Sequence, residues 1–459
     1  MVTDILTRLE RLEHLVLMVC FIVLLLSLSV GGLRYFFHRF PKSSRLHLAT
    51  RTNAHGIVFG WAAPGIVAYS PCAAEGHIAV IGGSGFGKTS ALLIPTLRSW
   101  QGPALAIDIS GDICKNVSGN KIVYAPLEQG GVCYNPFYRI DALNDQDDQD
   151  EALEQLAYLL MPRPVKKSDA SEFFTSEGRK ILIAALLSGY HSGKDFSEIC
   201  QAVVKLGWKD LFSLIDRSKY PPASSYIQPF EGASEKNTAG CKQAVDEAIG
   251  LFARNRHVRE SLHRPSPGEH CFSPPDLEHH KVFVIVPDEA LEQLAPLLRL
   301  VTAQTLEYIS TRPLNATETI LLALDEFSSL GSLDILPALR KSRKRHTRIM
   351  VLTQSLSDLE LTYGKEARGS MMSNFAYKAI LDVADAEGQE TFAKLIGRHD
   401  ATKETHSIPG GFASGNRTIT TEQRYIIEPD KLDNLGNSLI LLHPGGYTKL
   451  RKSFYFKPF

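Results

Sequence analysis

The segment Gly82–Thr89 constrains the fold of this chain more than any other stretch, because its residues read GGSGFGKT. It follows a short apolar run, His77–Ile81, and leads into residues with helical character, Lys88–Leu97. A glycine-rich turn between a buried strand and a helix lets successive backbone N–H groups point at one anion. The amino end of the helix adds its positive dipole at the same place. The pattern therefore predicts a P-loop, a phosphate-binding turn.

The residue types in this loop suit a nucleoside triphosphate and a metal ion. The Lys88 ammonium suits the β- and γ-phosphates, and the Thr89 hydroxyl suits Mg²⁺. ATP and Mg²⁺ are therefore the predicted cofactors. The predicted nucleotide contacts are Gly82, Gly83, Ser84, Gly85, Phe86, Gly87, Lys88, Thr89 and Ser90.

An acidic pair further along the chain is the expected partner of this loop. The apolar run Ile320–Leu324 ends in Asp325 and Glu326. We expect Asp325 to join Thr89 in holding Mg²⁺ and Glu326 to polarise the attacking water as a general base. Apolar runs that end in two acids are common, so a strand ending in a solvated turn is the alternative for this pair.

A basic run at 340–345 precedes the next apolar run, Arg348–Leu352. In phosphoryl transfer a guanidinium, often from a neighbouring subunit, stabilises the negative charge on the γ-phosphate. Arg343 is the candidate for this role. Gln354 follows the apolar run and is the candidate sensor of the γ-phosphate. A solvated face, or a surface for DNA phosphates, is the alternative for the basic run.

Short apolar runs bounded by turn residues recur along the chain and are separated by helical patterns. Such runs are typical of a mostly parallel sheet covered on both faces, and so of an α/β fold. They lie at His77–Ile81, Ala104–Asp108, Lys121–Ala125, Val282–Val286, Ile320–Leu324, Arg348–Leu352, Tyr377–Val383 and Leu439–Leu442.

The region between the two groups of runs has no strand pattern from about 191 to 265. Apolar spacing predicts helices at Glu172–Tyr190, Asp195–Leu206 and Cys241–Phe252. An all-α domain inserted into the α/β domain is the simplest account. We expect Asp141–Asp150 to be a solvated acidic loop and His38–Ser70 to be a connector.

An uncharged apolar stretch, Leu15–Leu33, precedes all of these motifs. A helix rises ~1.5 Å per residue, so this stretch nearly spans the ~30 Å hydrocarbon core of a bilayer. A cleaved signal peptide is the alternative, but acidic residues accompany the basic ones before the stretch. Basic residues dominate after it, which predicts a transmembrane helix with its downstream side in the cytoplasm.

The net charge and the spacing of the cysteines argue against some kinds of binding site. The chain has 50 basic and 50 acidic residues, so its net charge gives no argument for nucleic-acid binding. Its seven cysteines are scattered and none forms a CxxC pair. We therefore expect neither a zinc site nor a disulfide framework, and the thiols suit a reducing compartment.

Taken together, the motifs from about residue 75 to 455 resemble the type IV secretion coupling proteins, a family of conjugation ATPases. The order of the motifs and the intervals between them carry the resemblance. They are GGSGFGKT at Gly82–Thr89, DISGD at Asp108–Asp112, YNPF at Tyr134–Phe137, LDEFSSLGSLDIL at Leu324–Leu336, SRKRHTRIMVLTQSLSDL at Ser342–Leu359, YGKEARGSMMSNF at Tyr363–Phe375 and YIIEPDKLDNLGNSLILL at Tyr425–Leu442.

The resemblance implies a RecA-like domain with an inserted all-α domain, assembled as a homo-hexamer at the bacterial inner membrane. Its implied partners are relaxase and other relaxosome proteins, single-stranded or plasmid DNA, and components of the secretion channel. By position, Arg343 matches the family's arginine finger and Gln354 its strand-end glutamine. The expected division is an anchor at 1–40, a nucleotide-binding domain at 41–190 and 276–459, and an all-α domain at 191–275.

Two rival functions use the same motifs. One is a DNA translocase of the chromosome-segregation type, which is also a RecA-like ring. The other is a recruitment platform for secretion substrates, in which ATP gates assembly and does not drive transport. A transporter nucleotide domain is disfavoured, because no LSGGQ-like signature follows the P-loop.

Overall fold

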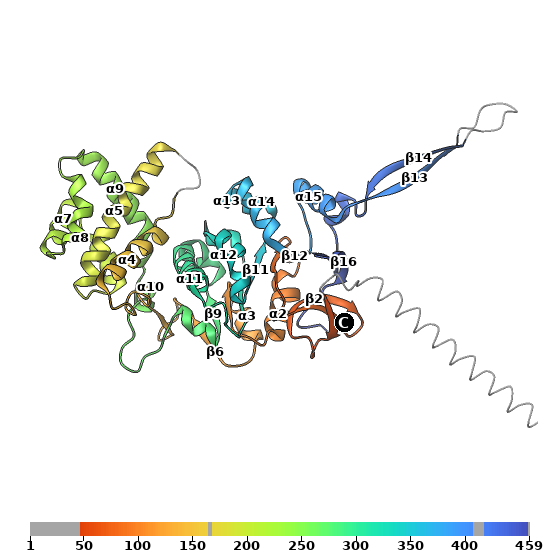
Figure 1. Cartoon of the computed structure of the whole chain (residues 1–459), viewed down its shortest axis with the longest axis horizontal. Coiled ribbons are helices and arrows are strands. Elements are labelled where there is room, and N and C mark those ends of the chain that lie inside the picture. The colour runs from red at the N-terminus through yellow and green to blue at the C-terminus, as the bar shows by residue number, and fades with distance from the viewer. Residues whose placement is uncertain (1–45, 164–167, 407–416, 458–459) are drawn as a thin grey trace, which may run out of the picture.

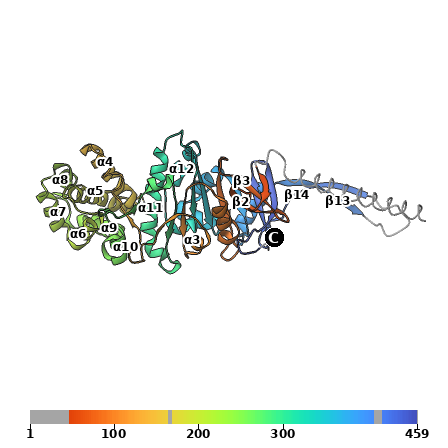
Figure 2. The same ribbon diagram turned by 90° about the horizontal axis from the view of Figure 1, so that it is seen from below.

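The computed structural model describes residues 46–163, 168–406 and 417–457. Its centre is a twelve-stranded sheet with the order β1-β3-β2-β16-β15-β12-β4-β11-β10-β5-β9-β6. Figures 1 and 2 show a group of helices at one end of the molecule and a long β-hairpin at the other. The predicted α/β fold with an additional helical domain is therefore confirmed.

Every apolar run predicted to be a strand is one. From β12 to β6 all neighbouring strands pair in parallel, as expected of strands that are buried on both faces. These strands and the antiparallel β15 are β4 (His77–Ile81), β5 (Ala104–Asp108), β6 (Lys121–Tyr124), β9 (Lys281–Ile285), β10 (Ile320–Leu324), β11 (Thr347–Thr353), β12 (Phe375–Ile380) and β15 (Ser438–His443).

The prediction of a connector at His38–Ser70 was wrong from residue 47 onward. The chain there forms β1 (His47–Thr50), β2 (Gly56–Ala63) and β3 (Ile66–Pro71), which extend the sheet in antiparallel fashion beyond β16 (Gly446–Arg451). Most of β2 is buried because the sheet and α2 cover it. Glycine and proline residues lie at the turn and at the strand ends of this hairpin, and in the sequence such residues indicate an irregular connector.

Alternate residues of the central strands face two hydrophobic cores. Ile78 and Val80 of β4 pack with η2 (Lys88–Leu93), α2 (Ile94–Ser99) and α3 (Asp112–Asn116). Ala79 and Ile81 belong to the other core, which contains α11 (Leu291–Thr311) and α12 (Ile335–Lys341). The two-residue period of a strand thus places one layer of helices on each face.

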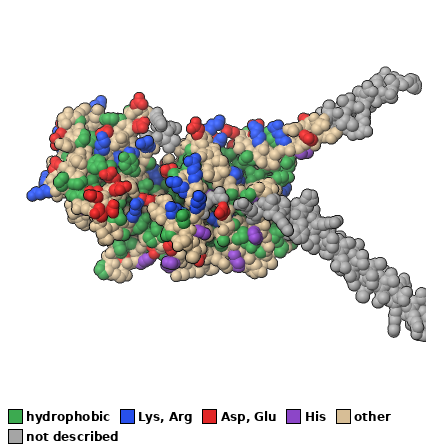
Figure 3. All heavy atoms as spheres, in the orientation of Figure 1, with side chains coloured by type: hydrophobic (Ala, Val, Ile, Leu, Met, Phe, Trp, Pro, Cys, Tyr) green, Lys and Arg blue, Asp and Glu red, His purple; other side chains and the backbone are tan. Residues whose placement is uncertain are grey.

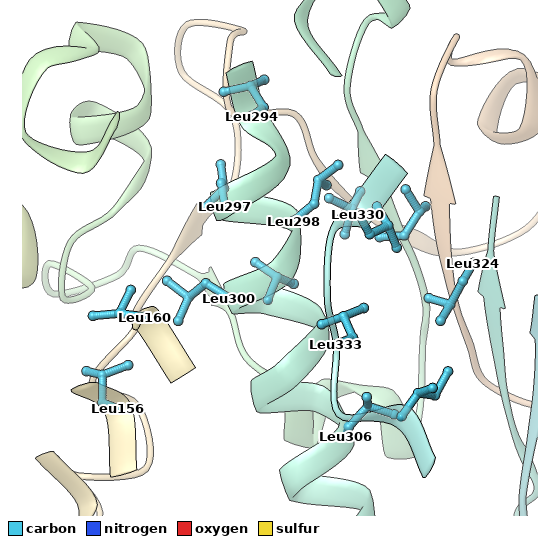
Figure 4. Close-up of a cluster of buried hydrophobic side chains, with 14 of the residues drawn as sticks. Leu156, Leu160, Leu294, Leu297, Leu298, Leu300, Leu306, Leu324, Leu330 and Leu333 are labelled. Atoms are coloured by element: carbon cyan, nitrogen blue, oxygen red, sulfur yellow. The ribbon is translucent and has the colours of Figure 1, made fainter. Parts of the chain in front are cut away.

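Helix α11 joins the sheet to the helical domain. Its leucines lie between Leu324 of β10 on one side and Leu156 and Leu160 of α4 on the other (Figure 4). All of these side chains are buried. Burial of one leucine contributes roughly 1.5–3 kcal/mol, so this double-sided packing holds the two parts of the molecule together.

In the described residues of the helical domain seven α-helices pack together, and the predicted helices are among them. The segment Asp141–Asp150 was predicted to be a loop, which is wrong for its second half. The Asp145 carboxylate accepts N–H groups from residues 147 and 148 and caps α4, because an acid at this position satisfies the free amides of a helix start. The helices are α4 (Gln146–Leu160), α5 (Asp169–His191), α6 (Phe196–Lys205), α7 (Trp208–Arg217), α8 (Pro221–Ile227), α9 (Glu235–Arg254) and α10 (Arg256–Ser261).

Two short parallel strands connect this domain to the sheet. In β7 (Cys133–Tyr134) and β8 (Cys271–Phe272), Cys133 pairs with Cys271 and the two form a disulfide. The expectation that the cysteines form no disulfide was wrong at this pair. Their separation of 138 residues has no local signature, and the fold alone brings them together.

The remaining elements flank the sheet or project from it. Helices α13 (Leu356–Tyr363), α14 (Lys365–Asn374) and α15 (Ala386–Ile396) follow β11 and β12. The strands β13 (Arg398–His406) and β14 (Arg417–Tyr425) form the projecting hairpin in Figure 1. The short helical turns are η3 (Gln228–Phe230), η4 (Pro274–Glu278), η5 (Asp288–Ala290), η6 (Phe327–Leu330), η7 (Ser342–Arg345) and η8 (Pro429–Leu432).

The predicted transmembrane segment, Leu15–Leu33, lies outside the described residues. Among the residues that the structure does describe, no helix combines the length and the apolar character needed to cross a bilayer.

Candidate nucleotide-binding site

The glycine-rich turn starts where β4 ends, at the carboxyl edge of the parallel strands. The Gly82 N–H donates to the Thr353 carbonyl at 3.2 Å, which ties the start of the turn to β11. Gly85 and Gly87 have φ values of 80° and 93°, a left-handed conformation that side chains disfavour. A Cβ on Gly87 would also lie 2.9 Å from the Phe454 ring. The turn therefore requires glycine at position 87 for two independent reasons.

Thr89 and Asp325 meet across this edge of the sheet. The Thr89 hydroxyl donates to Asp325 Oδ2 at 2.8 Å, and the Glu326 N–H donates to Asp325 Oδ1 at 3.0 Å. Burial raises the pKa of Asp325 to about 6, an effect that the Thr89 hydrogen bond opposes and the Glu326 charge reinforces. A hydroxyl and a buried carboxylate side by side are oxygen ligands of the kind that Mg²⁺ prefers.

Glu326 is held between two other predicted site residues. Its Oε1 lies 3.6 Å from Lys88 Nζ, and its Oε2 accepts a hydrogen bond from Gln354 Nε2 at 3.2 Å. Its backbone has φ 43° and ψ 48°, which is uncommon for a residue with a side chain and costs on the order of 1–3 kcal/mol. Lys88 Nζ also donates to the Gly83 carbonyl at 3.3 Å, so the lysine spans the loop and the acid.

A cavity of about 500 Å³ opens over these residues. This volume lies within the range of roughly 300–1,000 Å³ that is usual for small-molecule sites. The structure brings Lys88, Thr89, Asp325, Glu326 and Gln354 together around it. From the predicted loop contacts its lining also includes Gly83, Ser84, Gly85, Gly87 and Ser90, whereas Gly82 and Phe86 are not part of the lining.

The chain's last described segment supplies an aromatic wall that sequence reasoning missed. Tyr455 and Phe456 line the cavity, and the Tyr455 N–H donates to the Ser90 carbonyl at 3.0 Å. Arg51 and Arg98 hold this segment by donating to the carbonyls of Phe454 and Tyr455 at 3.1 and 3.3 Å. No local pattern marks these residues, because only strand β16 returns the chain to the P-loop.

Asp288 and Asp112 also line the cavity. Asp112 belongs to the DISGD motif, and the other acid of that motif, Asp108, has a structural task. Its carboxylate accepts N–H groups from Ile113 and Cys114 at 3.3 and 2.7 Å. Asp108 therefore fixes the turn that carries Asp112 to the cavity, and burial raises the pKa of its carboxyl.

Arg343 lies in η7, whose residues precede the amino end of β11. The P-loop follows the carboxyl end of β4, which runs parallel to β11. Within one chain, η7 and the P-loop therefore lie at opposite ends of the parallel strands: η7 at their amino ends and the P-loop at their carboxyl ends. The side chain of Arg343 lies outside what the structure describes.

The fold and the site define a P-loop nucleotide-binding protein with a helical insertion. A model of the type IV secretion-system coupling protein DNA-binding domain matches residues 62–453, which is most of the chain. The chain therefore belongs to this family of coupling proteins.

Curated relatives and solved structures agree with this assignment. Protein VirD4 of Rhizobium rhizogenes is 25% identical in an alignment of 401 positions, which covers 83% of this chain and 58% of the relative. The conjugal transfer protein TraG of Escherichia coli is 23% identical in an alignment of 400 positions, which covers 77% of this chain and 61% of the relative. The chain thus spans less than two thirds of the length of these relatives.

Two structures of the plasmid coupling protein TrwB share the fold. The complex of TrwB with a non-hydrolysable ATP analogue has a TM-score of 0.67 at 18% identity and covers 89% of this chain and 94% of TrwB. The complex with ADP and Mg²⁺ has a TM-score of 0.64 at 18% identity and covers 83% of this chain and 87% of TrwB.

Proposed function

We propose that this chain is a Mg²⁺-dependent ATPase that couples conjugative DNA transfer to a type IV secretion channel. The observation that carries the proposal is the contact between Thr89 and Asp325, which places the P-loop against the acidic pair. Membership of the coupling-protein family and the nucleotide complexes of the TrwB neighbours support it.

The side chains around the cavity suit in-line attack of water on a γ-phosphate. Lys88 lies where it would neutralise charge on the β- and γ-phosphates, and the loop amides would bind their oxygens. Glu326, held by Gln354, would accept a proton from the attacking water. Mg²⁺ held by Thr89 and Asp325 would supply further neutralisation of the phosphate charge.

The position of Arg343 favours action on a neighbouring subunit. Its backbone lies at the sheet edge opposite to its own P-loop, so its own nucleotide is out of reach. In a homo-hexameric ring, one subunit's η7 would face the next subunit's cavity and supply a cation to the γ-phosphate. Figure 3 shows Lys and Arg side chains gathered in the middle of one face, near α12 in Figure 1.

The proposed partners are relaxosome proteins with their single-stranded or plasmid DNA, and components of the secretion channel. The family's description as a DNA-binding domain supports the DNA partner. We place the protein in the bacterial inner membrane, with a single anchor helix at 15–33 and the ATPase domain in the cytoplasm. The division into 1–40, 41–190, 191–275 and 276–459 belongs to this proposal. We extend the all-α domain of this division to include α4 and α5, which precede residue 191, because α5 packs on α4, α8 and α9.

The decisive experiment compares Glu326→Gln with the wild type in a conjugation assay and in an ATPase assay with and without single-stranded DNA. We expect hydrolysis to fall by roughly 10²–10⁴-fold, because the general base is lost, with nucleotide binding retained. DNA transfer should fall with it. Glu128→Gln, at an exposed position away from the cavity, is the matched control.

Other outcomes would separate the rival functions. Normal transfer by an ATPase-dead Glu326→Gln protein would indicate a nucleotide-gated recruitment platform and overturn the motor proposal. Stimulation by double-stranded DNA alone would favour a DNA translocase of the chromosome-segregation type.

A further inference from the structure

The neck between the sheet and the helical domain brings together three side chains that the nucleotide site does not use. The chain leaves the sheet region through β7 and returns through β8, where Cys133 and Cys271 face each other with Cα atoms 4.4 Å apart. One ring nitrogen of His263 lies within 4.8 Å of both sulfurs. A disulfide uses the two sulfurs and does not involve the imidazole.

Both ring nitrogens of His263 lie beside an oxygen atom that can orient the imidazole. Its Nδ1 lies 3.0 Å from the Glu260 carbonyl, and its Nε2 lies 3.0 Å from Glu269 Oε1. Histidine ligands usually donate their second ring nitrogen to a carbonyl or a carboxylate, which fixes the ring and its tautomer. Both ring nitrogens have such a partner here, so metal binding requires Nδ1 to leave the Glu260 carbonyl while Glu269 keeps Nε2 and orients the ring.

The ligand types and their spacing match a thiophilic divalent cation. Zn²⁺ binds thiolates at ~2.3 Å and imidazole at ~2.0 Å in a tetrahedron, so its ligand atoms lie roughly 3.5 Å apart. The histidine nitrogen lies within 4.8 Å of the sulfurs, so it is at most about 1.3 Å beyond that spacing, and a rotation of its side chain can shorten the distance. Cys133 is buried, whereas Cys271 and His263 are partly exposed, so an ion has access from one side.

We propose that Cys133, Cys271 and His263 bind Zn²⁺, or a divalent ion of similar chemistry, whenever the two sulfurs are thiols. Disulfides are rare in reducing compartments, and the proposed cytoplasmic location of this domain favours the thiol form. Binding then forms two zinc–sulfur bonds and one zinc–nitrogen bond and releases the two thiol protons. The disulfide and the metal complex are thus alternative states of the same two sulfurs, and a thiol or phosphine reductant supplies the two electrons that convert the disulfide to the metal-binding thiols.

Either state holds the two connecting strands of the helical domain together. Tyr134, next to Cys133, donates its hydroxyl proton to Gln304 of α11 at 2.6 Å and packs its ring 5.5 Å from that of Phe272. A bound ion would therefore fix the neck to the helix that packs against the sheet. Because this site does not touch the nucleotide cavity, metal binding here can be tested independently of ATP hydrolysis.

Titration of the full-length protein with Co²⁺ tests the proposal. The protein is reduced with a phosphine, freed of metal and titrated while absorbance reports thiolate-to-cobalt charge transfer. We expect one ion per chain, displaced by Zn²⁺. Cys271→Ser should abolish the signal, and Glu269→Gln should weaken binding roughly 10- to 100-fold, since it removes the carboxylate that orients His263.

The control is Cys200→Ser, which removes a free buried thiol of α6 and should bind Co²⁺ as the wild type does. Circular dichroism shows whether each variant is folded. If Cys271→Ser does not fold, His263→Asn, at a partly exposed position, takes its place as the variant that should lose Co²⁺ binding. The proposal is overturned if folded, reduced wild type with both thiols open to maleimide takes up no Co²⁺. It is equally overturned if the disulfide resists reduction in the native protein.

Discussion

Replacement of Asp325 by Asn should make the nucleotide-free protein more stable near neutral pH while destroying its metal site. The carboxyl is buried, and its pKa rises from 3.8 to about 6 on folding. The folded state therefore keeps this proton over a range of pH in which the unfolded chain has already lost it. Stability from this group is fully present below about pH 4 and is lost as pH rises to about 6.

The size of this loss follows from the shift of about two pKa units. At 1.36 kcal/mol for each unit, the ionised carboxylate costs the nucleotide-free protein on the order of 3 kcal/mol above pH 6. Asn carries no such cost. It can still accept from Thr89, so any change in hydrogen bonding is a constant offset at every pH. The stability advantage of the variant should thus grow between about pH 4 and pH 6 and then level off.

Thermal unfolding of both proteins across this pH range, without nucleotide or metal, measures the effect. Asp112→Asn, an exposed position in the same cavity, is the matched control and should show no such growth. Adding Mg²⁺ and a non-hydrolysable ATP analogue should reverse the order, because only the wild type binds them well. A stability difference between Asp325→Asn and wild type that is the same at pH 4 and pH 7 would refute the reasoning.

Two further substitutions test other parts of the site. Gln354→Ala removes the hydrogen bond that holds Glu326, so we expect kcat for ATP to fall roughly tenfold or more with KM little changed, as steady-state kinetics would reveal. Unchanged kcat would mean that the glutamine does not position the base. Gly87→Ala forces a side chain into a left-handed backbone and against the Phe454 ring, and should cost at least ~1–2 kcal/mol of stability in thermal unfolding. Gly119→Ala, also left-handed but with open space, separates the backbone cost from the clash.

The central sheet was predictable because its signals are local. A strand buried on both faces must be continuously apolar, and runs such as Ile320–Leu324 show this without knowledge of their neighbours. The P-loop and the acidic pair follow from the same logic, since parallel strands end at one edge. The contact of Thr89 with Asp325 was therefore expected before it was seen.

The features that were missed depend on long-range contacts. The hairpin β2–β3 is buried because the C-terminal strand β16 pairs with β2 and helix α2 covers it. Tyr455 reaches the cavity because β16 returns the chain to the P-loop. Cys133 and Cys271 are far apart in the chain and have no spacing that a motif describes. Sequence patterns report the environment of each segment, and they do not report which distant segment provides it.

Helix α11 gives the molecule a physical path between the acidic pair and the helical domain. One side of the helix packs on η6, which directly follows Glu326, and Leu324, which directly precedes Asp325, belongs to the same hydrophobic core. The other side contacts α4 and α9 of the helical domain. Dense packing transmits displacement because it leaves little free volume. We therefore expect a shift of Glu326 toward a γ-phosphate to displace α11, which would link the nucleotide to the helical domain in the function proposed above.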